Sequence, residues 1–251
     1  MKKKFKINFV DFSTRFKNNY NILLKAFKSA GEEGNYILGK NVEIYEKELS
    51  KICKSPYVVS VNSGFDAIKL GLGLYGIGYQ DEVITVSNSY IATASAIKAL
   101  GAKPIFVDID NTYNMDPQKI QNKINNKTKA IMPVHLAGMP AQMNDIKKIA
   151  KKNSLFLFED CAQAIGASIN NKKVGNFGNL GFFSLHPLKN VHVLGDGGFI
   201  TVRYKRDYEK LKLLRNNGHK NRDEIISWGH NSRLDEIQAA FGIALLKKYK
   251  S

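Results

Sequence analysis

The chain has few cysteines and no long apolar segment. Its 251 residues include two cysteines, Cys53 and Cys161, which are too few for a disulfide framework and fit a reducing compartment. No apolar run approaches the roughly 18 residues that indicate a transmembrane helix. The chain opens with Met1 and three lysines, but a polar mixture follows in place of the apolar segment of a secretory signal. We therefore expect a cytoplasmic protein without a membrane partner.

Acidic residues are scarce relative to basic ones. There are 22 aspartates and glutamates against 38 lysines and arginines, which gives a formal net charge of +16. Such a charge is one signature of a nucleic-acid partner. However, the lysines are spread along the whole chain, and no helix-turn-helix, zinc-knuckle or RNP-type segment accompanies them. The sequence therefore favours a solvated lysine-rich surface with no nucleic-acid partner. The positive potential of this surface would attract an anionic metabolite.

The order of apolar and polar residues predicts an α/β fold. From about residue 56, short apolar runs alternate with segments of helical period. Alternation at this spacing favours a mostly parallel sheet flanked by helices on both faces. The predicted strands are 57–61, 82–86, 103–108, 129–134 and 155–158, the predicted helices are 66–75, 91–100 and 141–152, and two later apolar runs are 180–185 and 198–204.

The two ends of the chain have other patterns. Residues 1–55 are expected to form a helical, peripheral segment, followed by one large domain at 56–251. At the other end, the pattern from Asn231 to Ser251 predicts one long helix.

One glycine motif has the wrong position for the function that it suggests. Residues 71–76 match the dinucleotide-binding pattern G-x-G-x-x-G. That pattern needs its glycines between a strand and the start of a helix, where backbone amides can contact a pyrophosphate. Here the glycines come at the far end of a predicted helix, so we expect close packing and a helix end instead.

Two segments that follow predicted strands suit a phosphate and a planar ring. Small residues around Ser63 and Gly64 stand at a predicted helix N-terminus, where free amides and the helix dipole favour an anion. Ser63 or Asp66 could equally serve only as a helix cap. Tyr90 stands at a similar junction, where an aromatic ring can stack on a planar ligand or pack under its own loop.

A carboxylate pair follows another predicted strand. Glu159 and Asp160 come directly after three apolar residues. A carboxylate buried there needs a partner, such as a protonated ring nitrogen, an arginine or a metal ion. A metal requires converging ligands, and His135, His186 and His192 form no recognisable set, so we expect none.

Lys189 differs in its setting from most other lysines of the chain. It stands in a turn just after an apolar run, whereas most lysines lie on polar helix faces. Partial burial would lower its pKa and make its amine nucleophilic toward a carbonyl carbon. The alternative is an ordinary exposed loop lysine.

Taken in order, these segments resemble the DegT/DnrJ/EryC1/StrS family of pyridoxal-phosphate sugar aminotransferases. The similarity extends from 34–39 to 237–240 and includes 133–143, 159–163, 194–198 and 231–238. So many motifs in one order over most of a chain are specific to this family. The resemblance implies the aspartate-aminotransferase-like large domain, known as fold type I, with pyridoxal 5'-phosphate as its cofactor.

The resemblance also implies roles around the cofactor ring. Lys189 would hold the cofactor as a Schiff base. Asp160 would pair with the ring nitrogen and keep it protonated. Gln163 would hydrogen-bond the ring hydroxyl, and Tyr90 would stack on the ring.

For the cofactor phosphate, the resemblance implies contacts from two subunits. The backbone amides of Gly64 and Phe65, together with the Ser184 hydroxyl, would hold the phosphate. Asn231 would reach the cofactor of the neighbouring subunit, which implies a homodimer.

The implied reaction moves an amino group. A donor, usually glutamate in this family, supplies the amine, and a nucleotide-linked keto-sugar accepts it, for cell-surface polysaccharide or related glycan biosynthesis. Lys189, freed from the cofactor, would act as general base and acid.

The sequence departs from the family pattern in three places. Phe65 stands where the family usually has threonine, which removes one side-chain contact to the phosphate. His186 and Leu188 flank Pro187 where an aromatic and a small or hydroxyl residue are commoner, which indicates a distinct subgroup. Family members usually continue into a small C-terminal domain that helps to close the active site, and we expect that domain to be absent or truncated here.

Two other functions fit parts of this pattern. A truncated, non-catalytic paralogue would explain the missing C-terminal domain. A sugar dehydratase on the same fold uses pyridoxamine phosphate and has histidine in place of the cofactor-binding lysine, so Lys189 argues against it.

Overall fold

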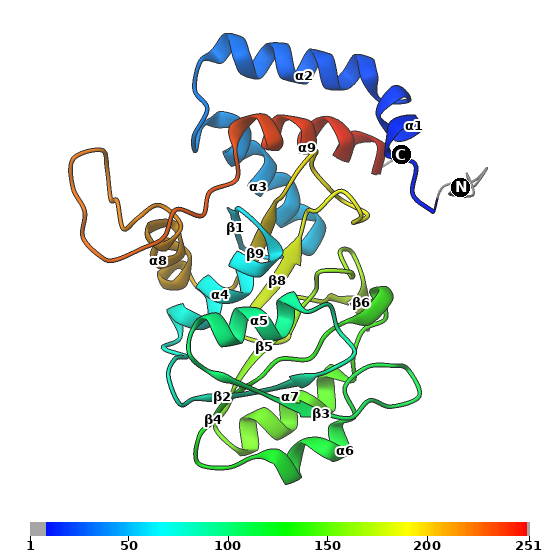
Figure 1. The fold of residues 1–251 in the computed structure, drawn as a ribbon, viewed down its shortest axis with the longest axis vertical. Helices are drawn as coiled ribbons and strands as arrows, with labels where there is room; N and C mark the ends of the chain where they lie inside the picture. Colours follow the sequence, from blue (N-terminus) through cyan, green and yellow to red (C-terminus); the bar gives the residue numbers. More distant parts are fainter. Residues whose placement is uncertain (1–8, 250–251) are drawn as a thin grey trace, which may run out of the picture.

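The computed structural model describes residues 9–249, which form an α/β fold (Figure 1). The opening residues Met1 to Lys4 lie outside this range. A seven-stranded sheet has the order β1-β9-β8-β5-β4-β2-β3. Strand β9 is antiparallel to both of its neighbours, and the other pairs are parallel, so the predicted fold class is confirmed. The strands are β1 (Tyr57–Val61), β2 (Glu82–Val86), β3 (Lys103–Val107), β4 (Thr128–Ile131), β5 (Phe156–Asp160), β8 (Leu180–Ser184) and β9 (Gly198–Val202), with a separate ribbon of β6 (Ser168–Ile169) and β7 (Lys172–Lys173).

Helices occupy most of the connections between these strands. Within residues 9–249, none of them is long and apolar enough to cross a membrane. The helices are α1 (Phe12–Lys17), α2 (Tyr20–Glu33), α3 (Lys40–Cys53), α4 (Gly64–Leu74), α5 (Ala92–Ala99), α6 (Pro117–Ile120), α7 (Met143–Lys152), α8 (Lys205–Leu214) and α9 (Glu236–Tyr249), with short 3-10 turns η1 (Gln121–Lys123) and η2 (Leu136–Gly138).

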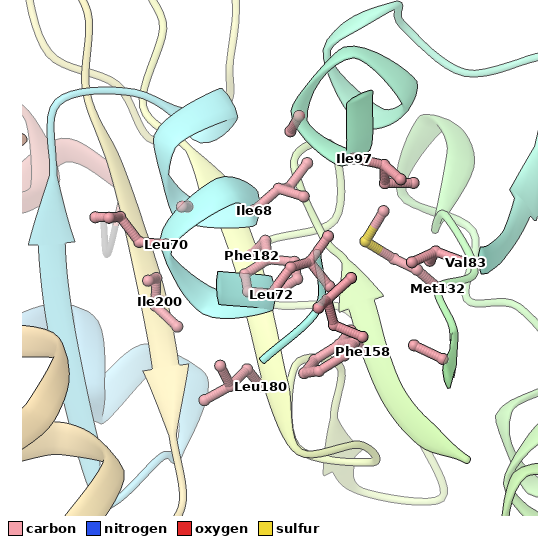
Figure 2. Packing of buried hydrophobic residues seen from close by; sticks show 14 of the residues in the cluster. Ile68, Leu70, Leu72, Val83, Ile97, Met132, Phe158, Leu180, Phe182 and Ile200 are labelled. Atoms are coloured by element: carbon pink, nitrogen blue, oxygen red, sulfur yellow. The ribbon is translucent and has the colours of Figure 1, made fainter. Parts of the chain in front are cut away.

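Both faces of the sheet are buried. Successive side chains of a strand point to opposite faces, and in β1 Val59 joins the cluster that α4 covers while Val58 joins the cluster that α3 covers. Figure 2 shows Leu72 of α4 beside Phe158 and Phe182 from the sheet. Burial on both faces explains why these strands are short, nearly continuous apolar runs in the sequence.

Helix α3 is part of the core, so the expectation that residues 1–55 are peripheral is wrong for this helix. Tyr45 and Leu49 are fully buried in a cluster that includes Leu246 of α9. Helix α2 in turn packs along α9 (Figure 1). The amphipathic pattern of α3 predicts a helix with one apolar face, but not which part of the protein covers that face.

Tyr45 buries a hydroxyl group that has no hydrogen-bond partner among the described residues. Burial also raises the pKa of this phenol. Because an unpaired buried hydroxyl is unfavourable, we expect Tyr45→Phe to increase the free energy of unfolding by about 1 kcal/mol. Urea denaturation measures the change, and Tyr20→Phe is the control because Tyr20 is 50% exposed. A less stable Tyr45→Phe protein would mean that the hydroxyl has a partner.

The glycines at 71–76 do not form a nucleotide-binding loop. Gly71 lies inside α4, where a Cβ atom would come within 2.2 Å of Cε1 of Phe182. Gly76 has a φ of +73° just after the helix. The predicted roles of these glycines in close packing and helix termination are therefore confirmed.

The predicted helix from Asn231 to Ser251 is wrong in its first part. Helix α9 begins at Glu236, and residues 231–235 contain no helix. The Ser232 amide donates to the Arg215 carbonyl at 2.9 Å, and the Ser232 hydroxyl donates to Asp66 Oδ2 at 2.8 Å. These contacts with distant segments replace the local bonds of a helix. Ser251 lies outside the described residues.

The parallel strands place their carboxyl ends at one edge of the sheet. Strands β1, β2, β4, β5 and β8 all run toward this edge, where open α/β sheets bind their ligands. Strand β5 extends beyond the predicted 155–158, so that Glu159 and Asp160 are its last two residues. The segments that we selected from the sequence therefore meet at one place.

Candidate active site

A cavity of about 620 Å³ lies at the carboxyl edge of the sheet. Another hollow, of about 730 Å³, lies between α3 and α8 and includes none of the predicted site residues. Seven of the eight predicted residues line the first cavity, namely Gly64, Phe65, Tyr90, Asp160, Gln163, Ser184 and Lys189. The eighth, Asn231, is exposed and pairs with Asn216 outside it.

The N-terminus of α4 forms one wall of the cavity. Ser63 caps this helix by accepting from the Asp66 amide at 3.1 Å. The first helical hydrogen bond runs from the Ala67 amide to the Ser63 carbonyl, so the amides of Gly64 and Phe65 precede the helical ladder. These free amides and the dipole of an eleven-residue helix make an anion site.

Glycine lets this helix start approach the neighbouring strands closely. A Cβ atom at Gly64 would come within 2.9 Å of Cβ of Ser184, at the end of β8. A Cβ atom at Gly198, at the start of β9, would come within 2.3 Å of the Ser63 carbonyl oxygen. The Ser184 hydroxyl therefore lies beside the start of α4.

Asp160 is a buried carboxylate without a cation in salt-bridge contact among the described residues. It is 3% exposed, and it accepts from Thr93 Oγ1 at 2.7 Å and from the Ala162 amide at 3.1 Å. Burial raises the pKa of Asp160, and these two hydrogen bonds oppose that rise. The positive charge of Lys189 opposes it as well. A cationic group in the cavity would stabilise the ionised carboxylate.

Thr93 is a site residue that the sequence reasoning missed. Its hydroxyl proton is donated to Asp160, so the Ser89 hydroxyl, 2.7 Å away, donates to Thr93 Oγ1. The sequence shows hydroxyl residues near Tyr90, but nothing in it connects Thr93 with a carboxylate 67 residues later.

Lys189 stands in a tight turn after β8. Its amide donates to the His186 carbonyl at 2.8 Å, and its side chain is half-buried and lines the cavity. Burial lowers the pKa of the Lys189 amine, while the nearby Asp160 carboxylate raises it, and the net change is downward. The amine is thus more often neutral than that of an exposed lysine, as a nucleophile or a base requires.

Glu159, although adjacent to Asp160, has a structural role. It is fully buried on the other face of β5 and accepts from the amides of Gly175, Phe177 and Gly178. His135 Nδ1 accepts from the Ala141 amide, so its Nε2 carries the proton and contacts Glu159 at 3.2 Å. Cys161 lies near both groups, but the lone pairs of His135 and Glu159 are already used, so this trio does not fit a metal ion.

Gln163 and Tyr90 also line the cavity. Gln163 Oε1 accepts from the Ala137 amide at 2.7 Å, which leaves the amide nitrogen of Gln163 free to donate into the cavity. Tyr90 is 72% exposed at the cavity rim, so it does not pack under its own loop. Its ring is therefore available to a planar ligand.

A comparison with known protein families identifies the chain. Residues 20–251 match the DegT/DnrJ/EryC1/StrS aminotransferase family. The chain belongs to this family. Its members are pyridoxal-phosphate-dependent aminotransferases.

Relatives of known name share much of the sequence. The dTDP-3-amino-3,6-dideoxy-alpha-D-galactopyranose transaminase of Aneurinibacillus thermoaerophilus is 49% identical over 210 residues, which are 83% of this chain and 58% of that protein. This chain covers 58–63% of three such curated relatives.

Solved structures confirm the aspartate-aminotransferase-like fold. The structure of S. venezuelae DesV in complex with a ketimine intermediate has a TM-score of 0.92 and 36% identity, over 97% of this chain and 66% of that one. NtdA from Bacillus subtilis with bound cofactor PMP has a TM-score of 0.90 and 33% identity, over 98% of this chain and 57% of that one.

Proposed function

We propose that this chain uses pyridoxal 5'-phosphate to transfer an amino group to a nucleotide-linked keto-sugar. One observation carries the proposal: the Lys189 amine and the buried Asp160 carboxylate line the same cavity, beside the free amides of α4. The name of the A. thermoaerophilus relative, a dTDP-sugar transaminase, supports the substrate class.

The residues of the cavity fit this cofactor. The amides of Gly64 and Phe65 and the Ser184 hydroxyl would hold its phosphate, and Asp160 would face its protonated ring nitrogen. The Gln163 amide nitrogen would donate to the ring hydroxyl, and Tyr90 would cover the ring. When bound, pyridoxal phosphate supplies an electron sink that stabilises negative charge on a carbon next to nitrogen.

The chain itself contributes the groups that bind covalently and move protons. Lys189 Nζ would hold the cofactor until an amino donor, glutamate in our proposal, displaces it. Its lowered pKa then lets Nζ accept a proton from the donor carbon and return it to a neighbouring atom. In the net reaction, glutamate and the keto-sugar become 2-oxoglutarate and the amino sugar. The amino group of glutamate is thereby exchanged for the ketone oxygen of the sugar.

We also propose a homodimer in which Asn231 contacts the cofactor of the second subunit. Asn231 is exposed and lies outside the cavity of its own chain. The segment that carries it follows a long loop that projects from the body of the protein (Figure 1). This placement supports a contact with another subunit.

Trapping of the cofactor tests the proposal directly. Purified protein incubated with pyridoxal phosphate should acquire a visible absorbance band, and borohydride should reduce the covalent bond and fix the label. Peptide mapping should then find the pyridoxyl group on Lys189. A label on another lysine, or a chain that takes up no cofactor, would overturn the proposal.

Thr93 should affect the cofactor through Asp160. Thr93→Val keeps the shape of the side chain but removes the hydroxyl that donates to Asp160, so the pKa of this carboxyl should rise further. Because a hydrogen bond to a buried charged group is lost, we expect pyridoxal phosphate to bind about tenfold more weakly. Thr93→Ser retains the hydroxyl and should bind as the parent does. Equal affinities of the valine and serine variants, measured by cofactor titration, would show that Thr93 has no such role.

A further inference from the structure

The loop that carries Lys189 has little regular structure of its own. It joins β8 to β9, and residues 186–193 contain neither helix nor strand. Two backbone bonds run from the Lys189 amide to the His186 carbonyl and from the Val193 amide to the Leu185 carbonyl. The Leu188 amide also donates to His186 Nδ1 at 3.2 Å, and the buried side chains of Val191 and Val193 anchor the far end of the loop in the core. The part of the loop before Lys189, residues 186–188, is less buried, so contacts from other elements can help to fix it.

One arginine from the N-terminal helix holds the loop on both sides of the lysine. Nη1 of Arg15, in α1, donates to the Pro187 carbonyl oxygen at 2.7 Å and lies 3.3 Å from His192 Nε2. His192 Nδ1 lies 3.0 Å from the Val193 carbonyl and donates to it, so Nε2 of the neutral ring is free to accept from Arg15. The same guanidinium nitrogen thus fixes a point before Lys189 and a point after it.

Lys189 lines two hollows, so the position of its loop decides which of them its amine faces. It lines the cavity of about 620 Å³ that contains Asp160. It also lines a second, separate hollow of about 480 Å³, which is distinct from the one between α3 and α8. Arg15, His192 and Tyr249 line this hollow as well. A small shift of the loop would turn the amine from Asp160 toward this second hollow.

We propose that Arg15 is a positioning residue, which holds the 186–193 loop so that the Lys189 amine faces the cofactor cavity. This inference rests on the proposed function, because it assigns Arg15 a task only if Lys189 binds the cofactor. It also gives α1 a role in the active site, although α1 lies outside the cofactor cavity.

The expected effect is moderate because Arg15 is exposed to solvent. Loss of its hydrogen bonds should weaken pyridoxal phosphate binding about fivefold, as for one partly screened interaction of a charged donor. In the cofactor-free protein, Lys189 should become more accessible. Relief of burial, the larger of the two causes, should raise the pKa of its amine by more than the loss of the Asp160 carboxylate lowers it, so the midpoint pH of its reactivity should rise toward that of an exposed lysine.

Competitive acetylation of the cofactor-free protein over a pH series, read by mass spectrometry, measures Lys189 without any need for cofactor. Arg15→Met should raise the midpoint for Lys189 and weaken cofactor binding. Arg15→Lys, which keeps a charged donor, should restore part of both. Lys17→Met removes a charge from the same helix without touching the loop and should match the parent.

The outcomes separate this inference from the proposed function. If the parent chain attaches cofactor to Lys189 and Arg15→Met matches Lys17→Met in both measurements, Arg15 does not position the lysine. If the parent attaches no cofactor to Lys189, the proposed function fails, while the acetylation profile still reports whether Arg15 holds the loop. Thermal unfolding of each variant checks the fold, and an Arg15→Met protein that unfolds early while its Lys189 profile stays unchanged would also overturn the inference.

Discussion

Replacing Lys189 with alanine is expected to abolish covalent attachment of pyridoxal phosphate and to reduce amino transfer from glutamate by at least about a thousandfold. Two functions are lost together, the covalent bond and the general base, and a positioned base alone contributes about 10² to 10⁴. The cavity would keep its phosphate cradle and Asp160, so the cofactor should still bind non-covalently. Absorbance and single-turnover measurements with glutamate distinguish these two kinds of binding.

Lys172 offers a matched control for this experiment. Burial lowers the pKa of Lys172 as well, with Lys147 as a further cause. However, its amine lies over the Phe177 ring, 4.7 Å from the ring centre, and does not line the cofactor cavity. Lys172→Ala should therefore bind and react as the parent does. A Lys189→Ala protein that still carries covalently bound cofactor would show that another lysine has this role.

The fold could be predicted largely from local pattern. Because the parallel strands are buried on both faces, each is a short apolar run, and the predicted 57–61 and 82–86 match the bounds of β1 and β2. The same topology explains why residues after separate strands meet at one edge of the sheet. The sites around Gly64, Tyr90, Asp160 and Lys189 could thus be placed together before any contact was known.

The positions of Glu159 and Asp160 could not be predicted from local pattern alone. Adjacent residues of a strand point to opposite faces, so one of the two had to leave the cavity, but the pattern does not say which. The partners that decide it are distant in sequence: the Gly175 amide binds Glu159, and the Thr93 hydroxyl binds Asp160. Only the resemblance to a family singled out Asp160.

Contacts between distant segments also explain one wrong prediction, the helix at 231–235, and one contact that the sequence could not predict. Residues 231–235 have a helical pattern, but hydrogen bonds from Ser232 to Arg215 and Asp66 keep them out of the helix. The contact between Arg15 and the loop of Lys189 joins segments 172 residues apart. Interactions of this kind depend on the assembled sheet, and a single sequence gives no spacing rule for them.

Asp160→Asn should have the second largest effect, because it removes the only buried charge that faces the cavity among the described residues. In the proposed function, the ring nitrogen of the cofactor would then lose the partner that keeps it protonated, and the ring would become a weaker electron acceptor. We expect the reaction with glutamate to slow by at least about a hundredfold, which corresponds to about 2.7 kcal/mol. The cofactor-free protein should change in stability by less than about 1 kcal/mol, since relief of the burial cost offsets one weakened hydrogen bond.

A second buried carboxylate, Glu82, provides a control for Asp160→Asn. It shows whether removal of any buried charge slows the reaction, or only removal of the charge in the cavity. Glu82 begins β2 at the opposite edge of the sheet, is 8% exposed and accepts from Asn125 Nδ2 at 2.8 Å. Glu82→Gln should leave cofactor binding and the glutamate reaction unchanged. The comparison uses single-turnover rates for the chemistry and urea denaturation for the fold. If Asp160→Asn reacted within a few-fold of the parent, the ring nitrogen would have to be held by another group, and the assignment of Asp160 would be wrong.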